Sequence, residues 1–175
     1  RSIDGEPFSI VSAEPELLEL QDTGRPLRLA VNPKKDQVLF SNHRYELCLL
    51  DLESRQVQVI DRGEMARIAG FSWSPDGEWV AYGASISAQR TALKLWRADS
   101  GKITQISDPV LQDVEPAFDP EGKYLYFLSN RTYSPSYSDI DNSWIYANAT
   151  NIVAVALRND VPSPLAPRND EEGED

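Results

Sequence analysis

The chain has 175 residues and a formal net charge of −11, because 28 acidic side chains outnumber 17 basic ones. Hydrophobic residues make up 41% and charged residues 26%, a composition typical of globular domains that excludes wholesale disorder. The acidic balance excludes a nucleic-acid footprint, since phosphate groups would be repelled.

No apolar run approaches the ~20 residues of a membrane-spanning helix, so we expect no membrane partner. The single cysteine, Cys48, cannot form an intrachain disulfide, and any histidine-dependent triad must use His43, the only histidine. No Gly-x-Ser-x-Gly motif supplies a nucleophile. We therefore predict no catalytic residue and no cofactor. The chain starts at the polar Arg1 rather than at a methionine, and we expect it to be an excised piece of a longer protein.

Three stretches align without gaps, at residues 31–40, 73–82 and 118–127, and their prolines lie 42 and 45 residues apart. A repeat of about 40–45 residues is typical of four-stranded propeller blades. In each stretch the proline presets φ for a tight turn, and an Asp-Gly or Glu-Gly pair then allows positive φ. The predicted structural turn residues are Pro33, Pro75, Asp76, Gly77, Pro120 and Gly122. The first copy has Lys35 in place of the glycine, so we expect a strained turn or one of another type.

In chain order, residues 1–24 hold two strand-like runs, at 8–11 and 17–20, which we predict to be outer strands of a preceding blade. Residues 25–65 form the next blade, with later strands predicted at 46–52 and 56–60. The run at 56–60 alternates apolar and polar residues, as half-buried strands do.

Residues 66–110 form a blade with later strands predicted at 92–99 and 102–106. Residues 111–167 form the last blade, in which a long loop at 132–142 precedes a returning strand at 151–157. Residues 168–175 read as an acidic, disordered linker.

The predicted fold class is therefore all-β: a β-propeller fragment of four-stranded antiparallel blades, about three and a half of them. Closed propellers typically have four to eight blades, so the ring would be open.

Three charged residues, Arg67, Asp113 and Glu115, lie just before or within the predicted innermost strands, which line the central channel of a propeller. They are candidates for contact with a ligand there, but the favoured interpretation is that they line the wall of a water-filled channel. The loop at 138–142 carries several oxygen ligands but lacks the glycine and distal glutamate of a calcium-binding loop, so we predict no metal site.

The segment at 71–77, Phe-Ser-Trp-Ser-Pro-Asp-Gly, resembles the WD40-like repeats of tricorn protease and of the periplasmic TolB propeller. The third copy, at 116–131, and the exit at 160–164 resemble the closing blade of the second propeller of tricorn-type peptidases. Tricorn-type peptidases are large, oligomeric serine hydrolases that degrade oligopeptides.

The resemblance implies a non-catalytic cytoplasmic segment that serves peptide access or filtering. It would pack against the remaining blades and the peptidase domains in a homo-oligomer. None of the family's catalytic residues maps onto this chain. The alternative is a TolB- or WD40-like propeller, in the periplasm for the TolB kind, that binds a partner protein.

Overall fold

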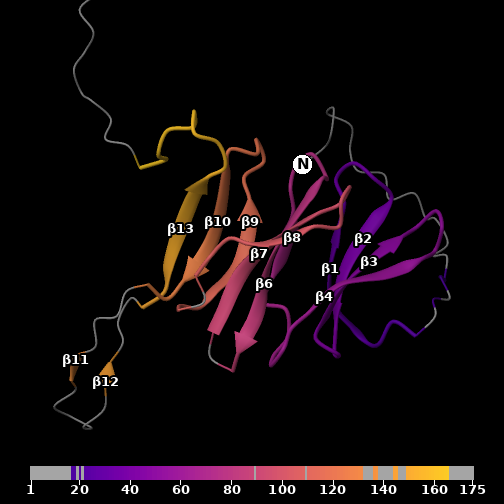
Figure 1. Ribbon diagram of the computed structural model, residues 1–175, viewed down its shortest axis with the longest axis horizontal. Coiled ribbons are helices and arrows are strands. Elements are labelled where there is room, and N and C mark those ends of the chain that lie inside the picture. Colours follow the sequence, from indigo (N-terminus) through magenta and orange to yellow (C-terminus); the bar gives the residue numbers. More distant parts are fainter. Residues whose placement is uncertain are drawn as a thin grey trace, which may run out of the picture.

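Three antiparallel sheets of three or four strands follow one another along the chain and stand side by side (Figure 1). The computed structural model describes residues 17–18, 20, 22–88, 90–108, 110–131, 136–137, 144–145 and 149–165. Every helix or strand assigned among these residues is a strand, and none of them belongs to a helix long and apolar enough to cross a membrane. The prediction of an all-β propeller fragment is confirmed.

The first two sheets each have four strands in sequence order. The first contains β1 (Pro26–Val31), β2 (Gln37–Asn42), β3 (Glu46–Asp51) and β4 (Val57–Arg62). The second contains β5 (Phe71–Trp73), β6 (Trp79–Ser87), β7 (Arg90–Arg97) and β8 (Ile103–Gln105). Neighbouring strands pair antiparallel throughout, as hairpin connections require.

The third sheet has three strands among the described residues, not the four expected of a blade. It contains β9 (Asp113–Phe118), β10 (Tyr124–Ser129) and β13 (Asn151–Ala156), with β10 in the middle. Residues 157–165 after β13 carry no strand. Within the long loop, the short strands β11 (Ser136–Tyr137) and β12 (Trp144–Ile145) pair with each other.

In the run at 17–20, where a strand was expected, the described residues Leu17, Leu18 and Leu20 lie outside any strand. The run at 8–11, the loop at 138–142 and the acidic segment at 168–175 lie outside the described residues.

The glycines of the repeated turns adopt the left-handed conformation that the sequence predicts. Gly77 has φ of 71° and Gly122 has φ of 68°, and their amides donate to the carbonyls of Ser74 and Asp119, each at 2.9 Å. The first turn is of another type. There the side chain of Asn32 accepts from the amides of Lys34 and Lys35, at 2.8 and 3.1 Å.

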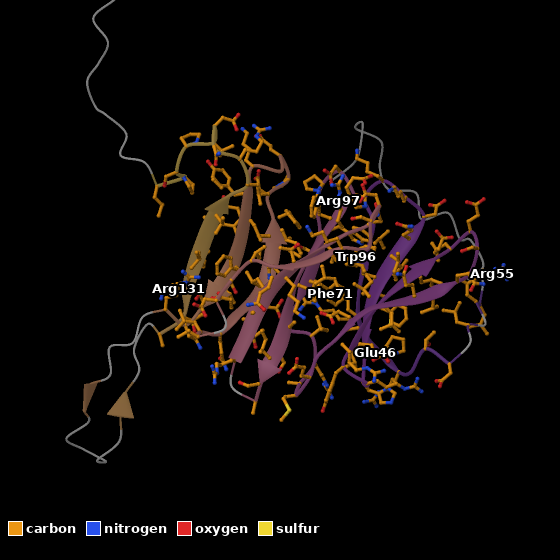
Figure 2. The ribbon with its side chains drawn as sticks, in the orientation of Figure 1. Glu46, Arg55, Phe71, Trp96, Arg97 and Arg131 are labelled. Carbon is orange, nitrogen blue, oxygen red and sulfur yellow. The ribbon has the colours of Figure 1, made fainter. Side chains whose placement is uncertain are left out.

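The main core lies between the first two sheets, where alternate strand positions bury large apolar side chains. Trp73 and Trp96 meet edge to face with ring centroids 6.3 Å apart. Figure 2 shows Phe71 and Trp96 in this central position. The first strands also converge, because β5 contacts β1 on one side and β9 on the other. This convergence is the radial arrangement of propeller blades.

Candidate functional site

A charged cluster joins the first strands of all three sheets. The guanidinium of Arg28, in β1, donates from Nη1 to both carboxylate oxygens of Glu115, in β9, at 2.9 and 2.7 Å. The same guanidinium lies over the ring of Phe71, in β5, with its Cζ 5.8 Å from the ring centroid. Both side chains of the ion pair stay about half exposed, at 52% for Arg28 and 44% for Glu115.

A β-bulge turns Glu115 toward Arg28. The register between β9 and β10 shifts between Tyr126 and Leu128, so that Glu115 and Pro116 oppose one residue of β10. Glu115 has φ of 52°, and its amide donates to the carbonyl of Ala69 at 3.0 Å. Bulges re-aim side chains in this way, and proline is tolerated in them because it has no amide to pair.

Gly70 makes room for the redirected glutamate. Its φ is 79°, and a Cβ built on it would lie 2.7 Å from both Cα and a carboxylate oxygen of Glu115. Any side chain at this position would therefore displace the glutamate. Gly70 thus belongs to the cluster because it leaves room for Glu115, although it has no side chain to contact the charged groups.

The structure separates the three predicted channel residues. Glu115 joins the cluster, whereas Asp113 is fully buried and its Oδ2 lies 3.4 Å from Nη2 of Arg131. Asp113 Oδ1 has no hydrogen-bond partner among the described residues. Arg67 is exposed in the loop before β5, and no ion pair joins it to either carboxylate within the described part of the chain.

Sequence reasoning missed Arg28, the partner that Glu115 actually uses. A signal was present, because the alternation of Pro26–Val31 places Arg28 on the same face as Ala30, which packs against the core. A charged side chain on the face that packs against the next sheet favours an opposite charge nearby. The position of that partner, 87 residues further along the chain, could not be read from the sequence.

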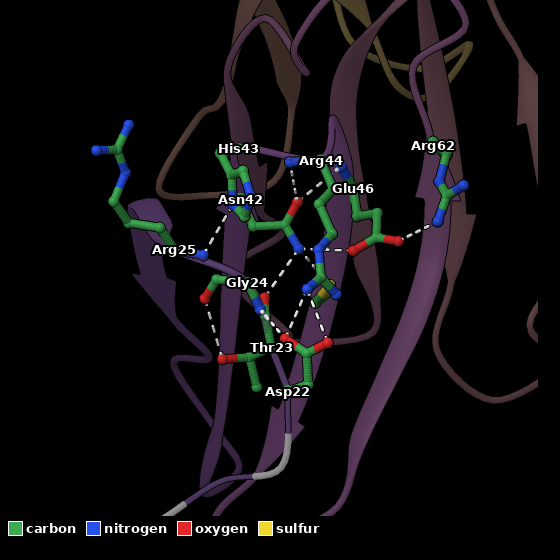
Figure 3. Close-up of polar contacts among 10 residues, drawn as sticks. Asp22, Thr23, Gly24, Arg25, Asn42, His43, Arg44, Glu46 and Arg62 are labelled. Atoms are coloured by element: carbon green, nitrogen blue, oxygen red, sulfur yellow. Dashed lines mark hydrogen bonds and ion pairs between the residues drawn. The ribbon is translucent and has the colours of Figure 1, made fainter.

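A second polar network surrounds the turn between β2 and β3 (Figure 3). Asn42 is fully buried; its Oδ1 accepts from the amides of Arg44 and Glu46, and its Nδ2 donates to the carbonyl of Thr23 at 2.9 Å. The Nδ2 atom also donates to Glu46 at 2.6 Å, and this bond holds the pKa of Glu46 below its ordinary value despite partial burial. The Arg62 guanidinium pairs with the other carboxylate oxygen of Glu46 and acts in the same direction.

The same network fastens the incoming segment at 22–25 to the turn. Arg44 pairs with both carboxylate oxygens of Asp22, at 2.6 and 2.7 Å. His43 Nδ1 accepts from the amide of Arg25 at 2.9 Å. The only histidine of the chain is therefore hydrogen-bonded to the backbone just before β1. Among the described residues, no group of three His, Cys, Asp or Glu side chains is placed to hold a metal ion.

Converging first strands, antiparallel sheets at a 42- and 45-residue repeat and an exposed ion pair on the inner strands define a segment of a β-propeller. Residues 8–175 match the family of the tricorn protease second beta propeller domain, and the chain belongs to this family.

Relatives and solved structures agree with this assignment. The chain is 36% identical over 138 residues to the tricorn-like protease C-terminal subunit of Sulfurisphaera tokodaii, covering 79% of this chain and 16% of that protein. It is 30% identical over 145 residues to tricorn protease homolog 1 of Streptomyces coelicolor, covering 83% and 14%. A crystal structure of the tricorn protease superposes with a TM-score of 0.74 at 26% identity, over 87% of this chain and 16% of that one.

The chain thus spans about a sixth or less of the length of these relatives. TolB from Acinetobacter baumannii superposes with a TM-score of 0.54 at 21% identity, over 69% of this chain and 31% of that one. This likeness supports the propeller fold alone.

Proposed function

We propose that this chain is a non-catalytic wall segment of a tricorn-like, oligomeric, cytoplasmic serine peptidase, and that it controls which peptides pass along its inner strands. The observation that carries the proposal is the half-exposed Arg28–Glu115 pair at the convergence of β1, β5 and β9. Membership of the tricorn second-propeller family supports a peptide-handling context.

Filtering by this segment would be steric and electrostatic and would break no bonds. The Arg28 guanidinium already donates to both oxygens of one carboxylate. It can therefore exchange the Glu115 carboxylate for a carboxylate of a passing peptide. The released Glu115 would in turn attract a peptide amine. Because the pair is half exposed, the exchange costs little in lost ion-pair energy.

The test uses a tricorn-type protease that contains this segment, assayed with a long unfolded peptide and with a short fluorogenic peptide. We expect Arg28→Ala and Glu115→Ala to change kcat/KM for the long peptide by about two- to fivefold, the effect of one exposed charged contact. Turnover of the short peptide should stay unchanged. Lys102→Ala, which removes an exposed cation from the turn before the outer strand β8, is the control. Equal effects on both substrates, or none, would refute the proposal.

The alternative function is a TolB-like interaction propeller, which the shared fold supports. It predicts that the segment captures a folded partner protein and that peptide length has no influence. The same two substrates therefore separate the alternatives.

A further inference from the structure

The repeated turn makes a close contact between the first and second sheets. Asn32, which precedes Pro33, is 4% exposed, and its Nδ2 donates to the carbonyl of Gly77 at 3.1 Å. Its Oδ1 occupies the space where a Cβ of Gly77 would lie. The turns of these two sheets are therefore locked together.

The equivalent contact between the second and third sheets is missing. Ser74 stands where Asn32 stands in the first copy, and its short side chain bonds within its own turn, to Asp76 and to the amide of Trp79. Gly122 stands where Gly77 stands, and no heavy atom lies within 4 Å of its built Cβ position. The two turns do not interlock as the first pair does.

A cleft of about 570 Å³ opens at this position. Its volume lies within the range of small-ligand and peptide pockets. Four large apolar side chains line it: Trp79 and Leu95 from the second sheet, Phe118 from the third, and Leu157 from the residue that follows β13. A large apolar side chain entering from solvent would find apolar surface on both walls.

The charges of the cleft favour a cation. Its charged lining residues are Asp76, Glu121 and Arg158. Glu121 pairs with Lys123, and Arg158 pairs with Asp160 at 3.1 Å.

Asp76 has no ion-pair partner within the described part of the chain. Arg97, whose guanidinium stacks on Trp79 at 5.2 Å, is itself paired with Asp99. The charge of Lys35 acts on Asp76, but the Lys35 ammonium is itself paired with Glu78 at 3.1 Å. Asp76 is therefore the carboxylate of the cleft that is free to form an ion pair with a ligand.

We propose that the cleft between the second and third sheets binds an extended peptide in which a large apolar side chain stands next to lysine or arginine. The apolar side chain enters between Trp79 and Phe118, and the cation pairs with Asp76. The inference deepens the proposed function and rests on it, because it assumes that unfolded peptides reach this segment.

The test measures binding of fluorescein-labelled, end-blocked hexapeptides to the 175-residue chain by fluorescence anisotropy. The probe contains Phe-Arg between alanines, and two comparison peptides carry Ser-Arg or Phe-Glu. We expect the Ser-Arg peptide to bind about tenfold or more weakly, because the buried ring is lost. The Phe-Glu peptide should also bind more weakly, because its carboxylate faces Asp76.

Substitutions probe the charged and the apolar half of the site separately. Asp76→Asn keeps the acceptor of the turn but removes the charge, and should weaken Phe-Arg binding by about two- to fivefold. Asp51→Asn removes a similar turn-capping charge, which accepts from Ser54 outside the cleft, and should leave binding unchanged. Ser74→Asn should fill the cleft as Asn32 fills the first gap. If Ser74→Asn unfolds the chain, Leu157→Glu tests the same point, because it places a charge in the apolar lining and should weaken Phe-Arg binding.

Equal binding of the three peptides, or equal effects of Asp76→Asn and Asp51→Asn, would overturn the proposal. A dimer that disappears in Leu157→Glu, together with no peptide binding, would show that a second copy occupies the cleft and would also overturn it. These outcomes are separate from the proposed function, whose test depends on Arg28 and Glu115 and on long-peptide turnover. Loss of cleft binding would leave that test unaffected.

Discussion

The hydroxyl of Tyr82, in the second sheet, donates to Oδ2 of Asp61, in the first sheet, at 2.8 Å. Lys94 Nζ lies 2.9 Å from the same oxygen, so one carboxylate oxygen accepts two contacts from the neighbouring sheet. Burial opposes ionisation of Asp61, but the bonds from Lys94 and Tyr82 outweigh it and lower its pKa below 3.8. This clamp holds the first two sheets together beside their apolar core.

Asp61→Asn should lower the free energy of unfolding by about 1–3 kcal/mol at pH 7, because partly buried, charge-assisted contacts are lost. Since the folded pKa lies below the unfolded one, the stabilisation is fully present well above the unfolded pKa of an aspartate and is lost as pH falls through the folded pKa. Urea unfolding at pH values from 7 to 3 should show the gap between wild type and variant narrowing at the acid end. Asp99→Asn, which removes an exposed pair with Arg97, should show almost no gap at any pH. A gap for Asp61→Asn that stays constant with pH would contradict the pKa direction.

Gly77→Ala should destabilise the chain more than Gly122→Ala. Both glycines have positive φ, which costs a residue with a Cβ about 1–2 kcal/mol. At Gly77 the new methyl group would also collide with the bonded side chain of Asn32, whereas the space around Gly122 is open. Thermal unfolding of the two variants measures the difference. Equal losses would mean that the Asn32 contact has no energetic weight.

Asn42→Ala should cost roughly 1–3 kcal/mol, because the amides of Arg44 and Glu46 lose their acceptor and one carboxylate oxygen of the buried Glu46 loses its donor. The amides of Arg44 and Glu46 should then exchange hydrogen faster. Asn130→Ala serves as the control, since Asn130 is exposed and bonds to the side chain of Gln112 at 3.1 Å. Unchanged exchange at Arg44 in Asn42→Ala would contradict the role assigned to this network.

The chain should associate with itself in a concentration-dependent way. On the outer face of the first sheet, β1 presents a row of exposed apolar side chains, Leu27, Leu29 and Val31, at 40%, 67% and 63%. An uncovered apolar strand of this kind is rare on monomers. Leu29→Lys should weaken association in sedimentation experiments, whereas Met65→Lys, at an exposed site outside this strand, should not. A wild-type chain that stays monomeric at high concentration would exclude this surface as an interface.

The sequence by itself determined the repeat, the class of fold and the turns. The turn at 75–77 depends on the backbone angles that its own residues prefer. Strand alternation depends only on residues close in the sequence. Turns and strands can therefore be predicted from local sequence. The resemblance of residues 71–77 and of the third copy to tricorn-type repeats was enough to predict the family, which the match over residues 8–175 confirms.

Only the tertiary structure decided how the charged residues are grouped. Counting alternate positions along β9 fails beyond Val114, because the bulge at Glu115 and Pro116 changes the face that later side chains occupy. Arg28 and Glu115 meet because the first strands of different sheets converge, and Asn32 reaches Gly77 for the same reason. Contacts between sheets depend on the packing of residues tens of positions apart, so the contact of Asn32 with Gly77 and the cleft beside Ser74 are recognisable only once the sheets are assembled.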